Sequence, residues 1–79
     1  MKTTKLLIID ESKDFIEVVR SNLKLSANIE ISLEATDGDR GLDLIKTRQN
    51  EYDVIVMDLV LPKRDGLSIL EEMQIKGIS

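Results

Sequence analysis

The chain of 79 residues is acidic, with 15 Asp and Glu residues against 11 Lys and Arg residues and a formal net charge of −4. This length fits one small domain, and the acidic balance argues against direct nucleic acid binding, which needs cations to neutralise phosphates. Cys and His are both absent from the sequence, which excludes zinc sites with those ligands, disulfide bonds and Ser-His or Cys-His catalysis within it. Because no apolar run is long enough for a membrane span or a signal sequence, we expect a cytoplasmic chain without a membrane partner.

Three segments predict β-strands. Residues 6–9 and 54–57 are short, continuous apolar runs, typical of parallel strands that are covered on both faces. Residues 30–35 alternate between polar and apolar side chains, which is typical of an edge strand. This alternation would place four apolar residues on one face of that strand: Ile29, Ile31, Leu33 and Ala35.

Helical patterns follow each of these strands. Ser12 is the expected N-cap of a helix that ends near Leu25, with Phe15, Ile16, Val19 and Leu23 on one apolar stripe. Asp37 and Gly38 open a second helix, which contains Leu42 and Ile45. Asp65 is the expected N-cap of a third helix, with Gly77 at its end. The buried face of this third helix would be formed by Leu67, Leu70 and Met73.

The strand–helix order, repeated three times, predicts an α/β fold with an open parallel sheet. A sheet of three strands is thin, and the third strand is the most apolar of them. Its outer edge would offer unpaired backbone groups to another strand. We therefore expect either that the chain is a fragment or that another chain covers this edge.

Acidic residues follow the two most apolar strands directly. Asp10 and Glu11 follow residues 6–9, and Asp58 follows residues 54–57. Ligands of open parallel sheets collect at the carboxyl ends of the strands. If these two strands are neighbours, three carboxylates converge there, and a hard cation such as Mg²⁺ or Mn²⁺ would offset their repulsion. The alternative interpretation is that each acid is a helix cap or a solvated turn residue.

Two other phosphate chemistries fit the sequence poorly. The first strand-to-helix turn, residues 10–13, contains no glycine, whereas dinucleotide sites and P-loops need glycines there. A phosphatase with an aspartate nucleophile would usually have a second acid two residues after Asp58, where this chain has Val60.

Three stretches together resemble the receiver domain of bacterial two-component response regulators. They are Ile8-Ile9-Asp10-Glu11, then Ala35-Thr36-Asp37-Gly38-Asp39-Arg40-Gly41-Leu42, and finally Val56-Met57-Asp58-Leu59-Val60-Leu61-Pro62-Lys63-Arg64-Asp65-Gly66-Leu67. The resemblance implies the first three strand–helix units of a flavodoxin-like (CheY-like) doubly wound parallel sheet, with strand order 2-1-3. Residues 1–79 would then be the N-terminal part of one receiver domain, without an output domain.

The resemblance also implies roles for individual residues. Asp58 would accept a phosphoryl group from a phosphohistidine on a histidine kinase or phosphotransfer protein, as a signalling phosphoacceptor rather than an enzyme. The ligands of Mg²⁺, or of Mn²⁺, would be Asp10, Glu11, Asp58 and the backbone carbonyl of Val60. Pro62 and Gly66 would shape the loop that aims this carbonyl.

The sequence departs from the family pattern at its C-terminal end. The family has five strand–helix units, and its fourth and fifth strands supply a Ser or Thr and a Lys that have no counterpart in this chain. An alternative function is therefore a truncated receiver that works as a non-catalytic association module. Its third-strand edge would then pair with another chain, for example in a homodimer.

Overall fold

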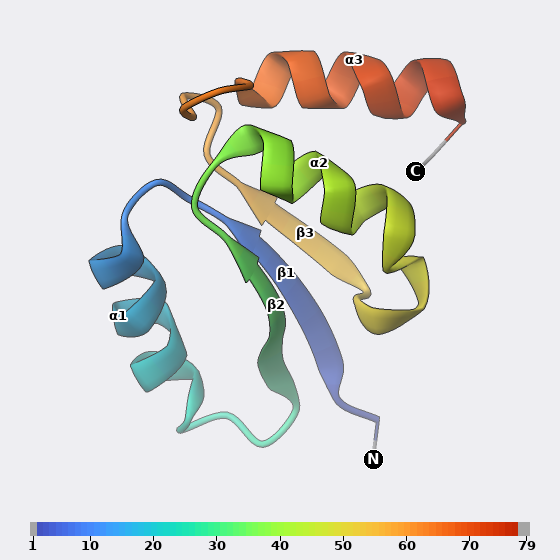
Figure 1. Cartoon of the computed structure of the whole chain (residues 1–79). Coiled ribbons are helices and arrows are strands. Elements are labelled where there is room, and N and C mark those ends of the chain that lie inside the picture. Colours follow the sequence, from blue (N-terminus) through green and yellow to red (C-terminus); the bar gives the residue numbers. More distant parts are fainter. Residues whose placement is uncertain (1, 78–79) are drawn as a thin grey trace.

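The computed structural model describes residues 2–77, which form one parallel sheet with helices on both faces (Figure 1). The elements, in chain order, are β1 (Thr4–Ile9), α1 (Lys13–Leu23), β2 (Ile29–Ala35), α2 (Gly38–Thr47), a short 3₁₀ turn η1 (Gln49–Glu51), β3 (Val54–Met57) and α3 (Gly66–Lys76). The three strands lie in the order β2-β1-β3, and both pairings are parallel. This confirms the predicted fold class and strand order. No helix in the described part of the chain is long and apolar enough to cross a membrane.

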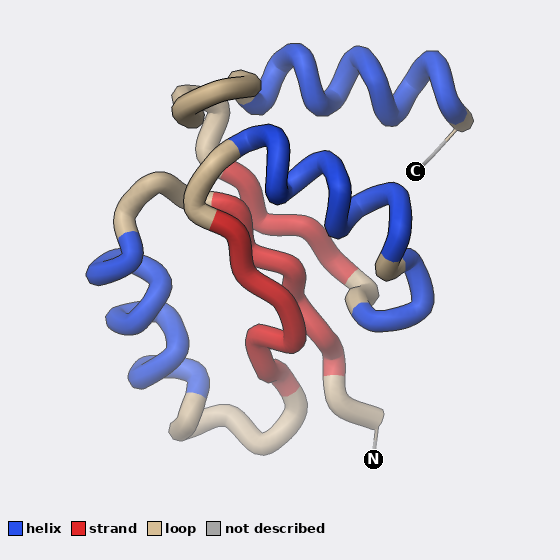
Figure 2. Tube along the Cα trace, in the orientation of Figure 1, coloured by secondary structure: helices blue, strands red, loops and turns tan. Residues whose placement is uncertain are grey.

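The main core lies on the face of the sheet that α2 and α3 cover (Figure 2). Leu7 and Ile9 point to this face from the central strand, and neither is exposed to solvent. The cluster is completed by buried residues of the neighbouring strand, the two helices and the loop before α3: Ala35, Leu42, Leu44, Ile45, Leu61, Ile69 and Met73. An ion pair of 3.2 Å between Lys46 and Glu72 joins α2 to α3.

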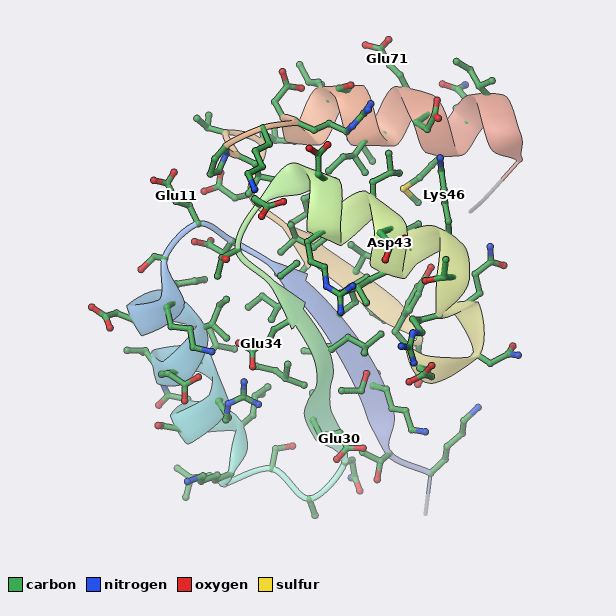
Figure 3. The ribbon with its side chains drawn as sticks, in the orientation of Figure 1. Glu11, Glu30, Glu34, Asp43, Lys46 and Glu71 are labelled. Carbon is green, nitrogen blue, oxygen red and sulfur yellow. The ribbon has the colours of Figure 1, made fainter. Side chains whose placement is uncertain are left out.

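The opposite face, which carries α1, is built differently. Ile8 of β1 and Ile16 of α1 are buried there. Glu34, which is paired with Ile8 in the sheet, binds α1 through Arg20 at 2.7 Å and Lys13 at 3.1 Å. Figure 3 shows the Glu34 side chain between β2 and α1. On this face, β2 therefore contacts its helix through a carboxylate that pairs with two cations, whereas apolar side chains make the contacts on the other face.

The prediction that four apolar residues of β2 share one face is wrong. The pairing of β1 with β2 shifts by one residue between Leu6 and Leu7, so that Ser32 is an extra residue in β2. Such a bulge reverses the alternation of side chains from that point on. Ile29 and Ile31 therefore lie on the α1 face, and Leu33 and Ala35 lie on the α2 face. The Ser32 hydroxyl donates to the carbonyl oxygens of Leu6 at 3.3 Å and Glu51 at 2.6 Å.

The predicted starts of the three helices, and the predicted end of α3, agree with the structure. The side chains of Ser12, Asp37 and Asp65 accept hydrogen bonds from backbone N–H groups three residues later, at 3.0, 2.8 and 2.8 Å. Such bonds satisfy donors that the first turn of a helix leaves free. Gly77 ends α3 with a φ of 73°, a left-handed conformation that glycine adopts readily. The first helix ends two residues earlier than expected, at Leu23.

Two predicted burial patterns need correction. The buried residues of α3 are Ile69 and Met73, which face the core one turn apart, whereas Leu67 and Leu70 are 60% and 45% exposed. In β3, Val54 and Val56 are each 45% exposed, so this strand is not covered on both faces. Both valines alternate with Ile55 and Met57, which pack against the α2 face. Within residues 2–77, β3 is thus covered by helices on one face only.

Candidate functional site

Asp10 and Asp58 lie at the same edge of the sheet because the hydrogen-bond ladders continue beyond the ends of the strands. The backbone N–H of Asp58 donates to the carbonyl of Ile9 at 2.9 Å, and the N–H of Asp10 donates to the carbonyl of Ala35 at 3.0 Å. These bonds fix both backbones at the carboxyl ends of β1 and β3. The prediction that Asp10 and Asp58 follow neighbouring strands at one edge of the sheet is thereby confirmed.

Each of these two carboxylates is held by the loop that follows it. One oxygen of Asp10 accepts the N–H of Ser12 at 2.9 Å, and one oxygen of Asp58 accepts the N–H of Val60 at 3.0 Å. This is the usual local bond of an aspartate at the start of a turn. Both contacts orient the side chains, and each uses one of the two carboxylate oxygens.

Glu11 does not join the other two acids. Its side chain is exposed and points outward from the loop between β1 and α1 (Figure 3). Among the described residues 2–77, no group of three or more acidic side chains is arranged so that it could hold a metal ion. The expected convergence of three carboxylates is therefore not present among these residues.

The donor chemistry of this edge nevertheless fits a hard divalent cation. Asp10, Glu11 and Asp58 offer carboxylate oxygens, and the loop after Asp58 offers backbone carbonyls. Oxygen-only donors are those that Mg²⁺ and Mn²⁺ prefer.

The loop between β3 and α3 folds back on itself next to Asp58. The Gly66 N–H donates to the carbonyl of Leu59 at 2.9 Å, and the Arg64 N–H donates to the carbonyl of Pro62 at 2.7 Å. A Cβ on Gly66 would lie 2.8 Å from the carbonyl oxygen of Asp58, closer than real contacts allow. Pro62 and Gly66 thus both make backbone contacts in this loop, and their role in aiming the Val60 carbonyl stays a prediction.

Our sequence reasoning missed the contact between this loop and the start of α2. The Nζ of Lys63 lies 3.6 Å from Oδ2 of Asp37, and the Nε of Arg64 lies 3.4 Å from Oδ1 of Asp39. The pKa of Asp37 is lowered, chiefly by the backbone N–H of Arg40 that its side chain accepts and further by the Lys63 ammonium. Two acids on either side of a glycine, and two adjacent cations after the proline, were the sequence signals of this contact.

A hollow of about 350 Å³ lies at the other end of the sheet. It is lined by residues of the N-terminal segment, of the last turn of α1 and of the following turn, and of β2, among them Arg20, Lys24 and Ile31. None of its lining residues belongs to the acidic edge, so it has no part in the site described here.

Comparisons with known proteins assign the chain to a family. Residues 6–78 match the family model of the response regulator receiver domain. The chain is 35% identical over 74 residues to the transcriptional regulatory protein DltR of Streptococcus agalactiae, a match that covers 94% of this chain and 31% of that protein. It is also 35% identical over 73 residues to a protein-glutamate methylesterase/protein-glutamine glutaminase of Geobacter metallireducens, where it covers 20% of the relative.

Solved structures show the same fold. The signal receiver domain of the response regulator NarL from Mycobacterium tuberculosis superposes with a TM-score of 0.85 at 27% identity, covering 99% of this chain and 61% of that one. A response regulator receiver domain protein from Clostridium thermocellum gives a TM-score of 0.77 at 28% identity, covering 94% and 58%. The chain thus spans about a third of the length of DltR, at 31%, and about three fifths of the NarL receiver, at 61%. This chain belongs to the response regulator receiver domain family.

Proposed function

We propose that this chain is a receiver in two-component signalling and that Asp58 accepts the phosphoryl group. The proposal rests on the position of Asp58 in this chain, which belongs to the receiver domain family. Asp58 directly follows β3, its backbone is hydrogen-bonded to the end of β1 at 2.9 Å, and Asp10 lies at the same edge of the sheet. On this proposal, residues 1–79 are part of a single receiver domain.

The proposed transfer needs a nucleophile and a donor. One oxygen of Asp58 accepts the Val60 N–H, which leaves the other oxygen to attack phosphorus. The phosphorus–nitrogen bond of the donor phosphohistidine breaks as the new phosphorus–oxygen bond forms, and the imidazole leaves with the bonding electron pair. The products are an acyl phosphate on Asp58 and an unmodified donor histidine.

Asp10, Glu11, Asp58 and the backbone carbonyl of Val60 are the proposed ligands of Mg²⁺, and Mn²⁺ suits the same donors. When bound, such an ion offsets the negative charge on the transferred group and the surrounding carboxylates. The residues of the chain orient the reacting carboxylate. The Val60 N–H orients the Asp58 carboxylate at 3.0 Å. Glu11, next to Asp10 in the chain, would hold the ion with a side-chain conformation other than the outward one of Figure 3.

The proposed partner is a histidine kinase or a phosphotransfer protein in the cytoplasm. CheY of Borrelia burgdorferi, which has the same fold at 23% identity, was solved in complex with CheX, BeF₃ and Mg²⁺. The chain itself would be a phosphoacceptor rather than an enzyme, although relatives such as the methylesterase carry an enzymatic activity in their names. Family membership favours this function over that of an association module, while a homodimer through the open edge of β3 stays a prediction.

Intact mass spectrometry after incubation with acetyl phosphate tests the proposal. We expect a Mg²⁺-dependent gain of one phosphoryl group on the wild-type chain and no gain on Asp58→Asn. Asp53→Asn is a matched control, because Asp53 lies at the opposite end of β3 and accepts the Lys5 N–H at 2.8 Å. An unmodified wild-type chain that is folded by circular dichroism would contradict the proposal, as would an equal gain on Asp58→Asn.

A further inference from the structure

The loop that follows Asp58 is fastened to the N-terminus of α2 by its backbone. The Gly38 N–H donates to the carbonyl of Pro62 at 3.0 Å. Gly38 is buried, and a Cβ at this position would overlap the carbonyl oxygen of Arg64. The two segments are in contact through backbone atoms, so neither can shift without the other.

Two ion pairs flank this backbone contact. Asp37 faces Lys63 at 3.6 Å, and Asp39 faces Arg64 at 3.4 Å. Lys63 has a φ of 69°, a left-handed conformation that a residue with a Cβ adopts only when its surroundings hold it. The Asp37–Lys63 pair acts on the residue whose backbone is strained. The pairs and the Gly38 contact thus hold one loop conformation.

This loop conformation reaches the proposed reaction through Val60. Val60 lies between Asp58 and the anchored residues 62–64, and its N–H orients the Asp58 carboxylate at 3.0 Å. We propose that residues 37–39 form a clamp that positions this loop for phosphorylation of Asp58, with Gly38 as its central positioning residue. This inference rests on the proposed function and extends it to residues outside the acidic edge.

Two glycines of α2 give a matched pair of variants. Gly38→Ala pushes on the backbone of Arg64, whereas Gly41→Ala pushes on the side chain of Ile9, whose Cδ1 would lie 2.8 Å from the new Cβ. Both substitutions crowd a buried position on the same helix, but only the first displaces the loop. We expect Gly38→Ala to slow phosphorylation by acetyl phosphate about tenfold or more, because small misplacements of reacting groups are costly. We expect Gly41→Ala to slow it less than Gly38→Ala does, because the Ile9 side chain that it crowds can adjust, whereas the loop that Gly38→Ala crowds is backbone.

A charge exchange tests the clamp without crowding, and it serves if Gly38→Ala does not fold. Arg64→Glu faces Asp39 with a like charge and should slow the reaction about twofold, the size expected of an exposed ion pair. Adding Asp39→Lys restores an opposite pair and should restore the rate. Adding Asp43→Lys instead gives the same net charge, but Asp43 lies one turn further along α2, where it pairs with Arg40 at 3.2 Å, and should not restore it.

Amide hydrogen exchange supplies a readout that does not depend on phosphorylation. The N–H groups of Arg64 and Gly66 are bonded within the loop at 2.7 and 2.9 Å. We expect both to exchange faster in Gly38→Ala than in Gly41→Ala, and faster in Arg64→Glu with Asp43→Lys than in Arg64→Glu with Asp39→Lys.

The outcomes separate the clamp from the proposed function. Equal exchange and equal rates within each matched pair would overturn the clamp while the wild-type chain still accepts phosphate. No phosphorylation of the wild-type chain would overturn the proposed function and the positioning role with it, and the exchange data would still show whether residues 37–39 hold the loop.

Discussion

The two faces of the sheet hold their helices by different means. On the α2 and α3 face, nine buried residues form one continuous aliphatic cluster around Leu7 and Ile9. On the α1 face, the fully buried apolar residues are Ile8 and Ile16, and Glu34 adds ionic contacts to α1. Phe15 and Val18 of α1, at 47% and 56%, remain largely exposed, as do the outward valines of β3.

This difference shows that one sheet can carry a helix by close packing on one side and by directed charge pairs on the other. Packing of apolar side chains is not weakened by the screening of charges and tolerates little loss of volume. Ion pairs between partly exposed groups are weakened by salt and tolerate changes of volume. The two faces should therefore respond to different perturbations, and four experiments follow from this contrast.

Removing a core side chain should have the largest effect. Ile45 is fully buried on the α2 face, so Ile45→Ala should lower the free energy of unfolding by about 2–5 kcal/mol. Val18→Ala on the α1 face should change it by less than about 0.5 kcal/mol, because Val18 is mostly exposed. Urea denaturation of both variants measures the difference. Similar losses for the two would show that the faces are not distinct.

Removing the shared carboxylate should have a smaller, salt-dependent effect. Glu34→Gln loses the ion pairs with Arg20 and Lys13 and should lower the free energy of unfolding by about 1 kcal/mol at low salt. This loss should shrink as the salt concentration rises, because the wild-type pairs are then screened. Asp43→Asn, which removes an exposed pair on α2, is the control and should have little effect. A loss independent of salt would contradict an ionic attachment of α1.

The third test concerns Tyr52, which packs against the core cluster on the α2 and α3 face. The Tyr52 hydroxyl donates to the carbonyl of Ile45 at 2.9 Å, and Tyr52→Phe should lower the free energy of unfolding by about 0.5–1 kcal/mol. Burial raises the pKa of Tyr52 above its usual value. Its contribution is therefore present below pH about 10, the unfolded pKa, and lost as the pH rises through the folded pKa. Thermal melts at high pH should show this loss in the wild type and not in Tyr52→Phe.

The smallest effect should appear in acid, at the start of α2. The Arg40 N–H and the Lys63 ammonium lower the pKa of Asp37 from its usual range, so the unfolded chain binds more protons at this residue than the folded chain does. Its stabilising contribution is present above pH about 4 and is lost as the pH falls through the folded pKa. Asp37→Asn keeps a good N-cap and removes this titration. An unchanged slope of stability with pH below 4 in the variant would contradict the assignment.

The sequence predicted the main elements of the fold because their signals are local. Continuous apolar runs marked β1 and β3, and Ser12, Asp37 and Asp65 marked the starts of the three helices. The bulge at Ser32 was missed because alternation of apolar residues continues through it in the sequence, although their faces change. The exposure of Leu67 was missed because apolar residues lie on several sides of α3, and its sequence alone does not tell which of them face the core.

The candidate site was predictable in position but not in conformation. Asp10 and Asp58 were placed at one edge because both follow apolar strands of a parallel sheet. The outward direction of Glu11 was not predictable, because an exposed side chain beside like charges follows solvation rather than sequence pattern. The contacts of Asp37 and Asp39 with Lys63 and Arg64 join segments about 25 residues apart, so the charges were visible in the sequence but their pairing was not.

The extra residue in β2 has a consequence for how sequence length can vary in this chain. Deleting one residue from the middle of a strand normally moves every later side chain to the wrong face of the sheet. Deleting Ser32 would instead bring Ile31 and Leu33 into regular alternation, and each would keep the face that it occupies now. The cost would be the hydroxyl bonds to Leu6 and Glu51 rather than the core. This strand can therefore lose the residue at position 32 while the remaining side chains stay on their present faces of the sheet.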